Sequence, residues 1–356
     1  MNNLESVSYA DPNVENSKLI SIIIPFKRIS LHLKECLHAI SLLSYANFEV
    51  ILLPDEKFER DEVSIGDLRN IINVIPTGAV LPGEKRNIGI AHSKGSIIAF
   101  IDDDAYPDRD WLRNALLCFD NPSVAGVGGP NLTHPSDGTR QMAGGIILQS
   151  WIGGGGLTYR YRARDLREDD DLPTVNLLIR KDVLDAVGGF DVKYWPGEDT
   201  YLCLRITKTL GKKLVYSPDV LVYHHRRPLF IPHLRQIWNY GRHRGHFAKI
   251  LPQNSRRPLY FAPSLMVVLL AASPLLFVVP SSLSKLYISG IFIYLVCVIF
   301  ESLRTKKVKL SLMIFLGIPL THITYGIAFI KGLLSPNIHT KIIDTTIITD
   351  HKSRSA

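Results

Sequence analysis

Residues 95–112 read GSIIAFIDDDAYPDRDWL and decide how the rest of the chain is interpreted. The uncharged run IIAFI over residues 97–101 is typical of a buried strand, and Asp102, Asp103 and Asp104 follow it directly. Open α/β sheets bind their ligands at the carboxyl ends of strands. Three adjacent carboxylates repel one another, and a bound Mg²⁺ or Mn²⁺ commonly offsets this repulsion while it holds a substrate diphosphate. The stretch therefore predicts a metal and diphosphate site, with a solvated turn as the alternative.

Short apolar runs alternate with longer helix-like stretches on both sides of this strand. LISIIIPF, FEVILLP and INVIP are such runs, and LHLKECLHAISLLS has the apolar spacing of a helix. This alternation predicts β-α-β units around a mainly parallel sheet. We therefore expect an α/β domain over residues 18–228, after a flexible polar tail over residues 1–17.

The charge of the chain restricts its partners. The 356 residues include 41 Lys and Arg against 33 Asp and Glu, a formal net charge of +8, which indicates an anionic partner. Residues 220–300 contain no acid, and their first part contains eight cations: Arg226, Arg227, Arg235, Arg242, Arg244, Lys249, Arg256 and Arg257. Because aromatic and aliphatic residues are interleaved with them, residues 229–258 predict a basic amphipathic segment that contacts anionic membrane lipids. Nucleic acid is not expected as a partner.

The region over residues 259–331 is apolar enough to enter a membrane. Residues 259–280 and 310–330 carry no charge, and about 20 apolar residues cross a hydrocarbon core. Residues 284–300 form a shorter third candidate, and we favour three transmembrane helices over two. Arg256 and Arg257 precede the first span and Lys306 and Lys307 follow the second, which predicts a multi-pass protein of the cell membrane with a cytosolic α/β domain. A polar tail is expected over residues 332–356.

Two later segments carry candidate chemistry. Glu198 and Asp199 stand between a glycine-rich aromatic loop, GGFDVKYWPG, and a helix expected over residues 200 to about 210. Two adjacent acids in a cleft raise one another's pKa, which suits a general base, although acids at a helix N-terminus are also simple caps. His224 and His225 end an apolar strand beside two arginines and are candidates for a metal or diphosphate site.

The sequence makes simpler predictions for two other segments. The second acidic run, LREDDDLP with its acids at residues 168–171, follows no apolar strand and ends at a proline, so we expect an exposed loop. The glycines at residues 153–156 are followed by aromatic and basic residues. They predict either a mobile loop that contacts the acceptor or an ordinary glycine loop.

Together, these segments resemble the family 2 glycosyltransferases. The resemblance covers residues 19–227 and is carried, in order, by SIIIPFKR, FEVILLPDE, EKRNIGIAHSKGSIIAFIDDDAYPDRDWL, GVGGPN, NLLIRKDVLDAVGGFD, GEDTYLCLR and YHHRR. It implies an α/β fold of the GT-A type, a nucleotide-sugar-binding sandwich with a mainly parallel central sheet. C-terminal transmembrane helices would follow this catalytic domain.

The resemblance also implies a role for individual residues. Asp102 and Asp104 match the family's DxD element, with Asp104 the expected direct ligand of Mn²⁺ or Mg²⁺ and Asp102 nearer the nucleotide, together with Asp103. Asp199 matches the catalytic base, and Glu198 lies beside it.

The remaining roles concern the metal and the nucleotide. His224 matches a position that contributes to the metal site in some members. The residues expected at the nucleotide are Pro25, Asp55, Arg86 and Asn87. Asp55 falls where the family usually has an acid that contacts the base of the nucleotide. Lys27 and Pro54 depart from the family's usual residues, which leaves the choice of nucleotide open.

The function implied is inverting transfer of one sugar from a nucleotide diphosphate sugar to a lipid-linked acceptor at the cytosolic membrane face, in glycan or polysaccharide biosynthesis. The acceptor is either a lipid-linked saccharide or a polyprenyl phosphate. The QxxRW element of processive synthases is absent, and RQIWNYGRHRG in its place is typical of non-processive members. A non-catalytic, membrane-anchored nucleotide-sugar-binding or scaffold protein is the alternative of a different class.

Overall fold

The computed structural model describes residues 18–58, 62–63, 66–278 and 280–336. The tail expected over residues 1–17 and most of the tail expected after residue 332 lie outside this part of the chain.

The centre of the α/β domain is an eight-stranded sheet in the order β3-β2-β1-β4-β9-β6-β10-β8. Its strands are β1 (Ile20–Pro25), β2 (Phe48–Leu53), β3 (Ile72–Val74), β4 (Ile97–Ile101), β6 (Val124–Gly128), β8 (Arg167–Asp169), β9 (Asn176–Arg180) and β10 (Lys213–Tyr216). Strands β1 to β4 run parallel, as do β6 and β10, whereas β9 is antiparallel to both of its neighbours and β8 is antiparallel to β10. The expected mainly parallel sheet is confirmed.

A second, three-stranded sheet has the order β5-β11-β7. It contains β5 (Ala105–Pro107), β7 (Asn131–Thr133) and β11 (Val222–His224). In its register His224 lies opposite Ala105. The small sheet therefore brings the end of the domain beside the acidic run that follows β4.

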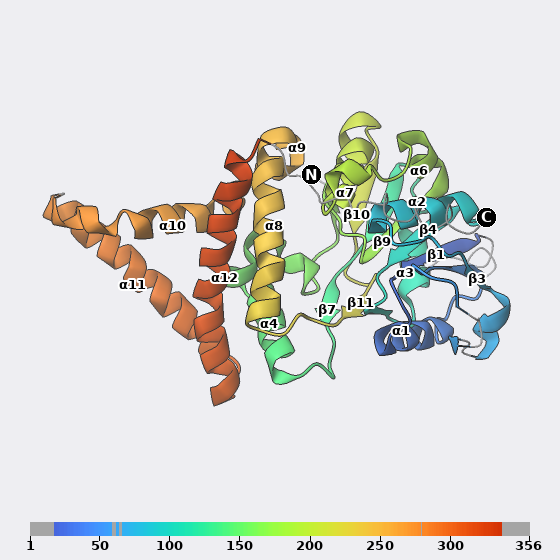
Figure 1. The fold of residues 1–356 in the computed structure, drawn as a ribbon, viewed down its shortest axis with the longest axis horizontal. Coiled ribbons are helices and arrows are strands. Elements are labelled where there is room, and N and C mark those ends of the chain that lie inside the picture. The colour runs from blue at the N-terminus through green and yellow to red at the C-terminus, as the bar shows by residue number, and fades with distance from the viewer. Residues whose placement is uncertain (1–17, 59–61, 64–65, 279, 337–356) are drawn as a thin grey trace, which may run out of the picture.

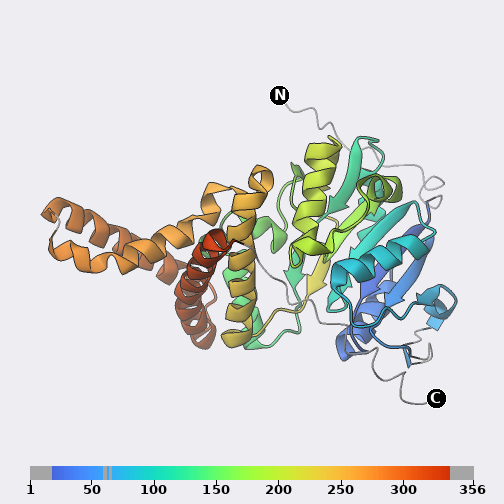
Figure 2. The ribbon, with the colours of Figure 1, turned by 45° about the horizontal axis from the view of Figure 1, so that its top comes forward.

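Helices cover both faces of the central sheet (Figures 1 and 2). The helices of this part of the chain are α1 (Leu31–Ser41), η2 (Gly66–Asn70), α2 (Pro82–His92), α3 (Trp111–Cys118), α4 (Thr139–Gln149), α5 (Trp151–Gly154), η3 (Gly155–Arg160), α6 (Lys181–Val187), η4 (Val192–Tyr194), α7 (Glu198–Leu204) and η5 (Arg205–Thr209). Helices α4 and α5 pack towards α12 (Val308–Leu334) and not on the central sheet. Successive residues of β1 point to opposite faces, so Ile22 packs in the core under α1 and α3, and Ile23 in the core under α2, α6 and α7. Helix α1 begins where Ser30 Oγ accepts a hydrogen bond from the Leu33 amide.

The C-terminal part extends away from the α/β domain (Figure 1). It contains α8 (Ile231–Ile250), α9 (Pro252–Ser255), η6 (Pro258–Tyr260), α10 (Ala262–Ala271), η7 (Ser273–Phe277), α11 (Ser281–Leu303) and α12 (Val308–Leu334). Helices α11 and α12 are long and apolar enough to cross a membrane.

The first expected span, residues 259–280, is not one helix. Helix α10 has ten residues and ends before the short helix η7, in which Pro274 lacks the amide that would continue the helical bonding. Ten helical residues extend about 15 Å, half of a hydrocarbon core. Within the described chain, therefore, two helices have the length of a span and not the three that we favoured.

Helices α8 and α12 pack with their backbones in close contact, and they lie side by side in both views (Figures 1 and 2). A Cβ atom on Gly245 would lie 2.1 Å from the carbonyl oxygen of Phe329, and one on Gly332 would lie 1.9 Å from that of Arg242. Helix α4 also contacts α12, through Ile147 and Ile314. The segment expected to lie along a membrane surface is thus largely packed between the α/β domain and α12.

Candidate active site

The acidic run lies where the sequence predicted, directly after β4 ends at Ile101. The Asp102 carboxylate pairs with Arg86 at 3.0 Å, and its side chain is one-third exposed, at 34%. Burial and the neighbouring acids Asp104 and Asp102 raise the pKa of Asp103 to about 7. Burial and the two adjacent carboxylates thus disfavour the ionised form of Asp103.

Asp104 and His224 form a contact between residues that are far apart in the sequence. His224 Nε2 lies 3.0 Å from Asp104 Oδ1, and Arg227 Nη2 lies 3.4 Å from Oδ2. The antiparallel pairing of β11 with β5 produces this contact, together with a hydrogen bond from the His225 amide to the Asp104 carbonyl. Burial alone would raise the pKa of Asp104, but His224 and Arg227 hold it well below its usual range.

Arg86 joins the two acidic motifs. Its Nη2 pairs with Asp102 Oδ1 and its Nη1 with Glu198 Oε1, both at 3.0 Å. Glu198 is buried, which raises its pKa, and Arg86 partly offsets that rise. One guanidinium from α2 therefore sets the separation between the acids after β4 and those that open α7.

Asp199 lies in the first turn of α7, as expected. Its Oδ1 accepts a hydrogen bond from the Thr200 amide at 2.8 Å. Burial raises its pKa and the neighbouring Asp171 adds to the rise, while Arg160 opposes it. A carboxylate whose pKa is raised in this way suits proton abstraction.

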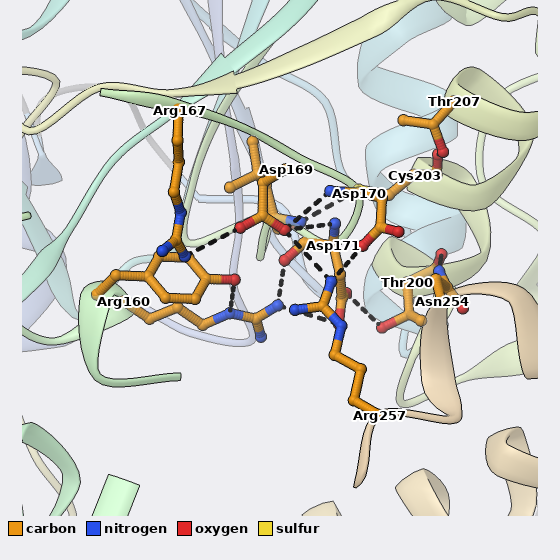
Figure 3. Close-up of polar contacts among 12 residues, drawn as sticks. Arg160, Arg167, Asp169, Asp170, Asp171, Thr200, Cys203, Thr207, Asn254 and Arg257 are labelled. Atoms are coloured by element: carbon orange, nitrogen blue, oxygen red, sulfur yellow. Dashed lines mark hydrogen bonds and ion pairs between the residues drawn. The ribbon is translucent and has the colours of Figure 1, made fainter. Parts of the chain in front are cut away.

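The second acidic run was expected to be an exposed loop, and this expectation is wrong for Asp171. Asp171 is 1% exposed, pairs with Arg160 at 3.0 Å, and accepts a hydrogen bond from Thr200 Oγ1 at 2.9 Å (Figure 3). It also pairs with Arg244 at 2.9 Å. Burial alone would raise the pKa of Asp171, but Arg244 and Arg160 hold it well below its usual range.

The neighbours of Asp171 are also paired. Arg257 contacts both Asp169 and Asp170 (Figure 3). Strand β8 pairs with β10 at the edge of the sheet, and Asp171, which follows β8, contacts Thr200 of α7. The sequence does contain a sign that these acids are paired, namely the surplus of arginines after residue 220. Two of those arginines, Arg244 and Arg257, pair with the acids. Those two arginines are therefore engaged within the protein and not with lipid as expected.

Asp55 has a lysine partner that the sequence analysis did not single out. Lys85 Nζ lies 2.5 Å from Asp55 Oδ1 and also donates to the carbonyl oxygens of Phe26 and Leu53. Burial lowers the pKa of Lys85, and Asp55 opposes that change. Asp55 thus lies at the carboxyl ends of β1 and β2, beside Pro25, which ends β1.

Asn87 has a different environment from the one expected. Its Nδ2 donates to the Phe190 carbonyl and its Oδ1 accepts from the Phe190 amide, both at 2.8 Å. These bonds attach α2 to the turn before α7, next to Gly189, which has a φ of +68°. The contact of Asn87 with a nucleotide stays a prediction, and its observed partners are those of a positioning residue.

A cavity of about 1350 Å³ connects the acids with the C-terminal helices. One end is lined by Asp102, Asp199 and His224 and the other by residues of α10, α11 and α12, including Met266, Tyr287 and Tyr294. The glycines at residues 153–156 also line it, but they belong to the helical turns α5 and η3 and do not form an open glycine loop. The cavity is therefore polar at the sheet and mainly apolar along the helices.

A mixed sheet of this topology, with acids at the ends of β2 and β4 and at the start of α7, defines a GT-A-type α/β domain. Residues 21–188 match the family model described as glycosyl transferase family 2. The chain therefore contains a family 2 glycosyltransferase domain.

Several known proteins are similar to the chain. Glycosyltransferase AglE of Haloferax volcanii is 27% identical over 219 residues, which are 59% of this chain and 67% of AglE. A pre-mycofactocin glycosyltransferase of Mycobacterium tuberculosis is 32% identical over 148 residues, 41% of this chain and 30% of that protein. The dolichyl N-acetyl-alpha-D-glucosaminyl phosphate 3-beta-D-2,3-diacetamido-2,3-dideoxy-beta-D-glucuronosyltransferase of Methanococcus voltae is 23% identical over 343 residues, 89% of this chain and 98% of that protein.

The fold is also similar to a solved structure. The mannosyltransferase PcManGT of Pyrobaculum calidifontis, in complex with GDP-Man and Mn²⁺, has a TM-score of 0.59 and 18% sequence identity and covers 88% of this chain and 87% of its own. This similarity concerns the fold alone, and it confirms the expected GT-A architecture.

Proposed function

We propose that this protein transfers one sugar from a nucleotide diphosphate sugar to a lipid-linked saccharide at a membrane. The cavity that joins Asp199 to α10, α11 and α12 carries this proposal. A lipid-linked acceptor needs a polar place for its sugar beside the base and an apolar place for its chain near the membrane, and one cavity offers both. The M. voltae relative is named for a dolichyl phosphate that carries N-acetylglucosamine, which agrees with such an acceptor.

We assign the catalytic base to Asp199. Its raised pKa suits removal of a proton from the attacking hydroxyl of the acceptor. The hydroxyl oxygen forms the new bond to the anomeric carbon as the bond to the diphosphate breaks. Attack from the face opposite the nucleotide inverts the anomeric configuration. Glu198 is held by Arg86 beside the base and positions α7.

The side chains after β4 fit a divalent metal ion. Asp104 and His224 lie 3.0 Å apart, and Asp102 and Asp103 add carboxylate oxygens in the same run. We assign Asp104, Asp102 and His224 as the residues that would hold Mn²⁺ or Mg²⁺. The ion, when bound, supplies positive charge that stabilises the departing diphosphate. Arg227, whose side chain is 59% exposed, adds a cation on the same side.

The nucleotide itself is assigned to the carboxyl ends of β1, β2 and β4. Pro25, Asp55, Arg86 and Asp103 surround this edge, and Lys85 holds the Asp55 carboxylate in place. Lys85 is only 3% exposed. Its ammonium group therefore supports the pocket from inside the protein and is not a free surface cation.

We place α11 and α12 in the membrane with the catalytic domain on the cytosolic side. The loop between them carries Arg304, Lys306 and Lys307, and Lys309 follows in α12, which is the basic pattern of a cytosolic loop. The exposed apolar side chains of α11, such as Leu286 at 70% and Phe292 at 65%, support contact with lipid.

The first experiment is release of nucleoside diphosphate and transfer of labelled sugar by the full-length protein in detergent. A panel of nucleotide sugars is tested with Mn²⁺, Mg²⁺ or chelator, with polyprenyl-linked saccharides or polyprenyl phosphate as acceptor. Transfer to a lipid-linked saccharide that is lost in both Asp104→Asn and Asp199→Asn supports the proposal.

Other outcomes identify the alternatives. Transfer to polyprenyl phosphate alone, retained in Asp199→Asn, identifies an acceptor whose oxygen is already ionised and needs no base. The cationic side chains of Arg226 and Arg227 at the cavity favour this second candidate. Binding of a donor without turnover on any acceptor identifies a non-catalytic sugar-nucleotide-binding protein.

A further inference from the structure

A second group of metal-binding side chains lies on the other side of β11 from the DxD-like run. His32 and Glu35 belong to α1, and His225 follows β11 directly. One ligand atom from each of these three residues lies within 4.8 Å of those of the other two. Nothing in the proposed sugar transfer uses this group.

The imidazole of His225 is oriented by a buried carboxylate. His225 Nδ1 is hydrogen bonded to Asp137 Oδ1, and the Asp137 side chain is fully buried. Asp137 is itself held by the Arg226 amide at 3.0 Å and by Gln141 Nε2 at 3.2 Å. Because a carboxylate only accepts hydrogen bonds, it places the proton of the neutral ring on Nδ1. The lone pair of His225 is then on Nε2.

Nε2 of His225 is buried and has no hydrogen-bond partner within the part of the chain that the structure describes. It lies 3.6 Å from Glu35 Oε2, beyond the length of a hydrogen bond. A histidine that donates one nitrogen to a carboxylate and directs the other, unprotonated nitrogen at further ligands has the arrangement of a metal-bound imidazole.

His32 and Glu35 complete the group. Their spacing of three residues places both on one face of α1, with His32 Nδ1 at 3.4 Å from Glu35 Oε2. Tyr106 Oη donates to Glu35 Oε2 at 2.8 Å and lies 3.1 Å from His32 Nδ1. Burial alone would raise the pKa of Glu35, but Tyr106 and His32 lower it, so the carboxylate is ionised at neutral pH.

The distances agree with tetrahedral coordination. Ligand atoms about 2.0–2.1 Å from a zinc ion are roughly 3.3 Å apart at the corners of a tetrahedron. The two separations from Glu35 Oε2, 3.4 Å to His32 and 3.6 Å to His225, are close to that value. The His32 and Glu35 side chains are 47% and 45% exposed, so an ion can reach them from solvent.

We propose that His32, Glu35 and His225 bind a Zn²⁺ ion, with Asp137 as the residue that orients His225 and water as the fourth ligand. This ion is separate from the metal of sugar transfer. It fastens α1 to the connection between β11 and α8, one residue from His224. The N-terminal half of the domain is thereby attached to the segment that leads to the membrane helices.

The test measures zinc binding by the full-length protein in detergent, after removal of metals with chelator, in an Asp104→Asn background that weakens the other site. We expect one Zn²⁺ per chain by elemental analysis and by competition with a chromophoric chelator. Glu35→Gln and His32→Gln are each expected to weaken binding at least tenfold, and Asp137→Asn about 10–100-fold.

His38→Gln is the matched control, since His38 is exposed on the same helix and lies outside the group. It should bind zinc as the parent does. A Co²⁺-loaded sample should give the strong visible bands of tetrahedral coordination and lose them in Glu35→Gln. Circular dichroism confirms that each variant is folded. Absence of zinc from the parent, or equal zinc affinity in parent, Glu35→Gln and His32→Gln, overturns the proposal.

Discussion

Arg244, on the first long helix after the catalytic domain, lies 2.9 Å from the buried carboxylate of Asp171. Asp171 is also bonded to Thr200, the residue after Asp199. The proposed base is therefore one residue from an ion pair that ends on α8, and α8 packs directly on α12. Four predictions concern this connection and the contacts around it.

Asp171→Asn is expected to lower the stability of the protein. The change leaves Arg160 and Arg244 without their carboxylate, and breaking a buried ion pair costs about 3–5 kcal/mol. Thermal unfolding in detergent should show a clearly lower Tm. Glu168→Gln, in the same acidic run but with a side chain 56% exposed, should change little. Equal Tm values for the two variants would contradict the network.

The same substitution should move the pH profile of sugar transfer. Asp171 contributes to the raised pKa of Asp199, so its removal lowers that pKa. A base acts in its deprotonated form, and kcat therefore rises as the pH passes the pKa of the base. The acid limb of kcat against pH is expected to shift to lower pH in Asp171→Asn. An acid limb in the same place as that of Glu168→Gln would argue against Asp199 as the base.

Arg86→Lys should impair transfer although the charge is kept. A guanidinium reaches Asp102 and Glu198 together, at 3.0 Å each, whereas one ammonium group does not provide the same fork. We expect kcat/KM for the donor to fall by roughly tenfold or more. Steady-state kinetics check this, with Arg109→Lys on the exposed surface as the control. A value of kcat/KM in Arg86→Lys equal to that of the control would disprove the bridging role.

Gly245→Ala should separate α8 from α12. The new Cβ would lie 2.1 Å from the Phe329 carbonyl oxygen, so the helices must move apart, and overpacking of this kind costs about 1–3 kcal/mol. Gly290→Ala on α11 is the matched control, because nothing lies within 4 Å of its added Cβ. Melting in detergent should show a lower Tm for the first variant alone. A similar Tm for both would mean that the two helices are not in close contact.

Features that depend on a short stretch of chain could be predicted. The buried strand before Asp102 and the acids at the start of α7 follow from local apolar patterning and residue type, and both lie where expected. The family resemblance then pointed to the contact between Asp104 and His224, but only the antiparallel pairing of β5 with β11 shows how residues 120 positions apart meet.

Features that depend on distant partners were missed. Asp171 stands in an acidic run that predicts an exposed loop, yet Arg244 approaches it from a helix 73 residues away and compensates its burial. The apolar composition of residues 259–280 predicted one span, but the chain folds them into α10 and η7 instead. Composition records hydrophobicity and does not record where a helix ends.

The sequence by itself determined the α/β class, the acidic motifs and the apolar C-terminal region, because strand burial, residue chemistry and hydropathy are local properties. Only the tertiary structure decided which charges are paired, how α8 contacts α12, and that His32, Glu35 and His225 meet. Those outcomes depend on which segments the fold brings together, and the free energy of a buried charge depends on the partner it finds there.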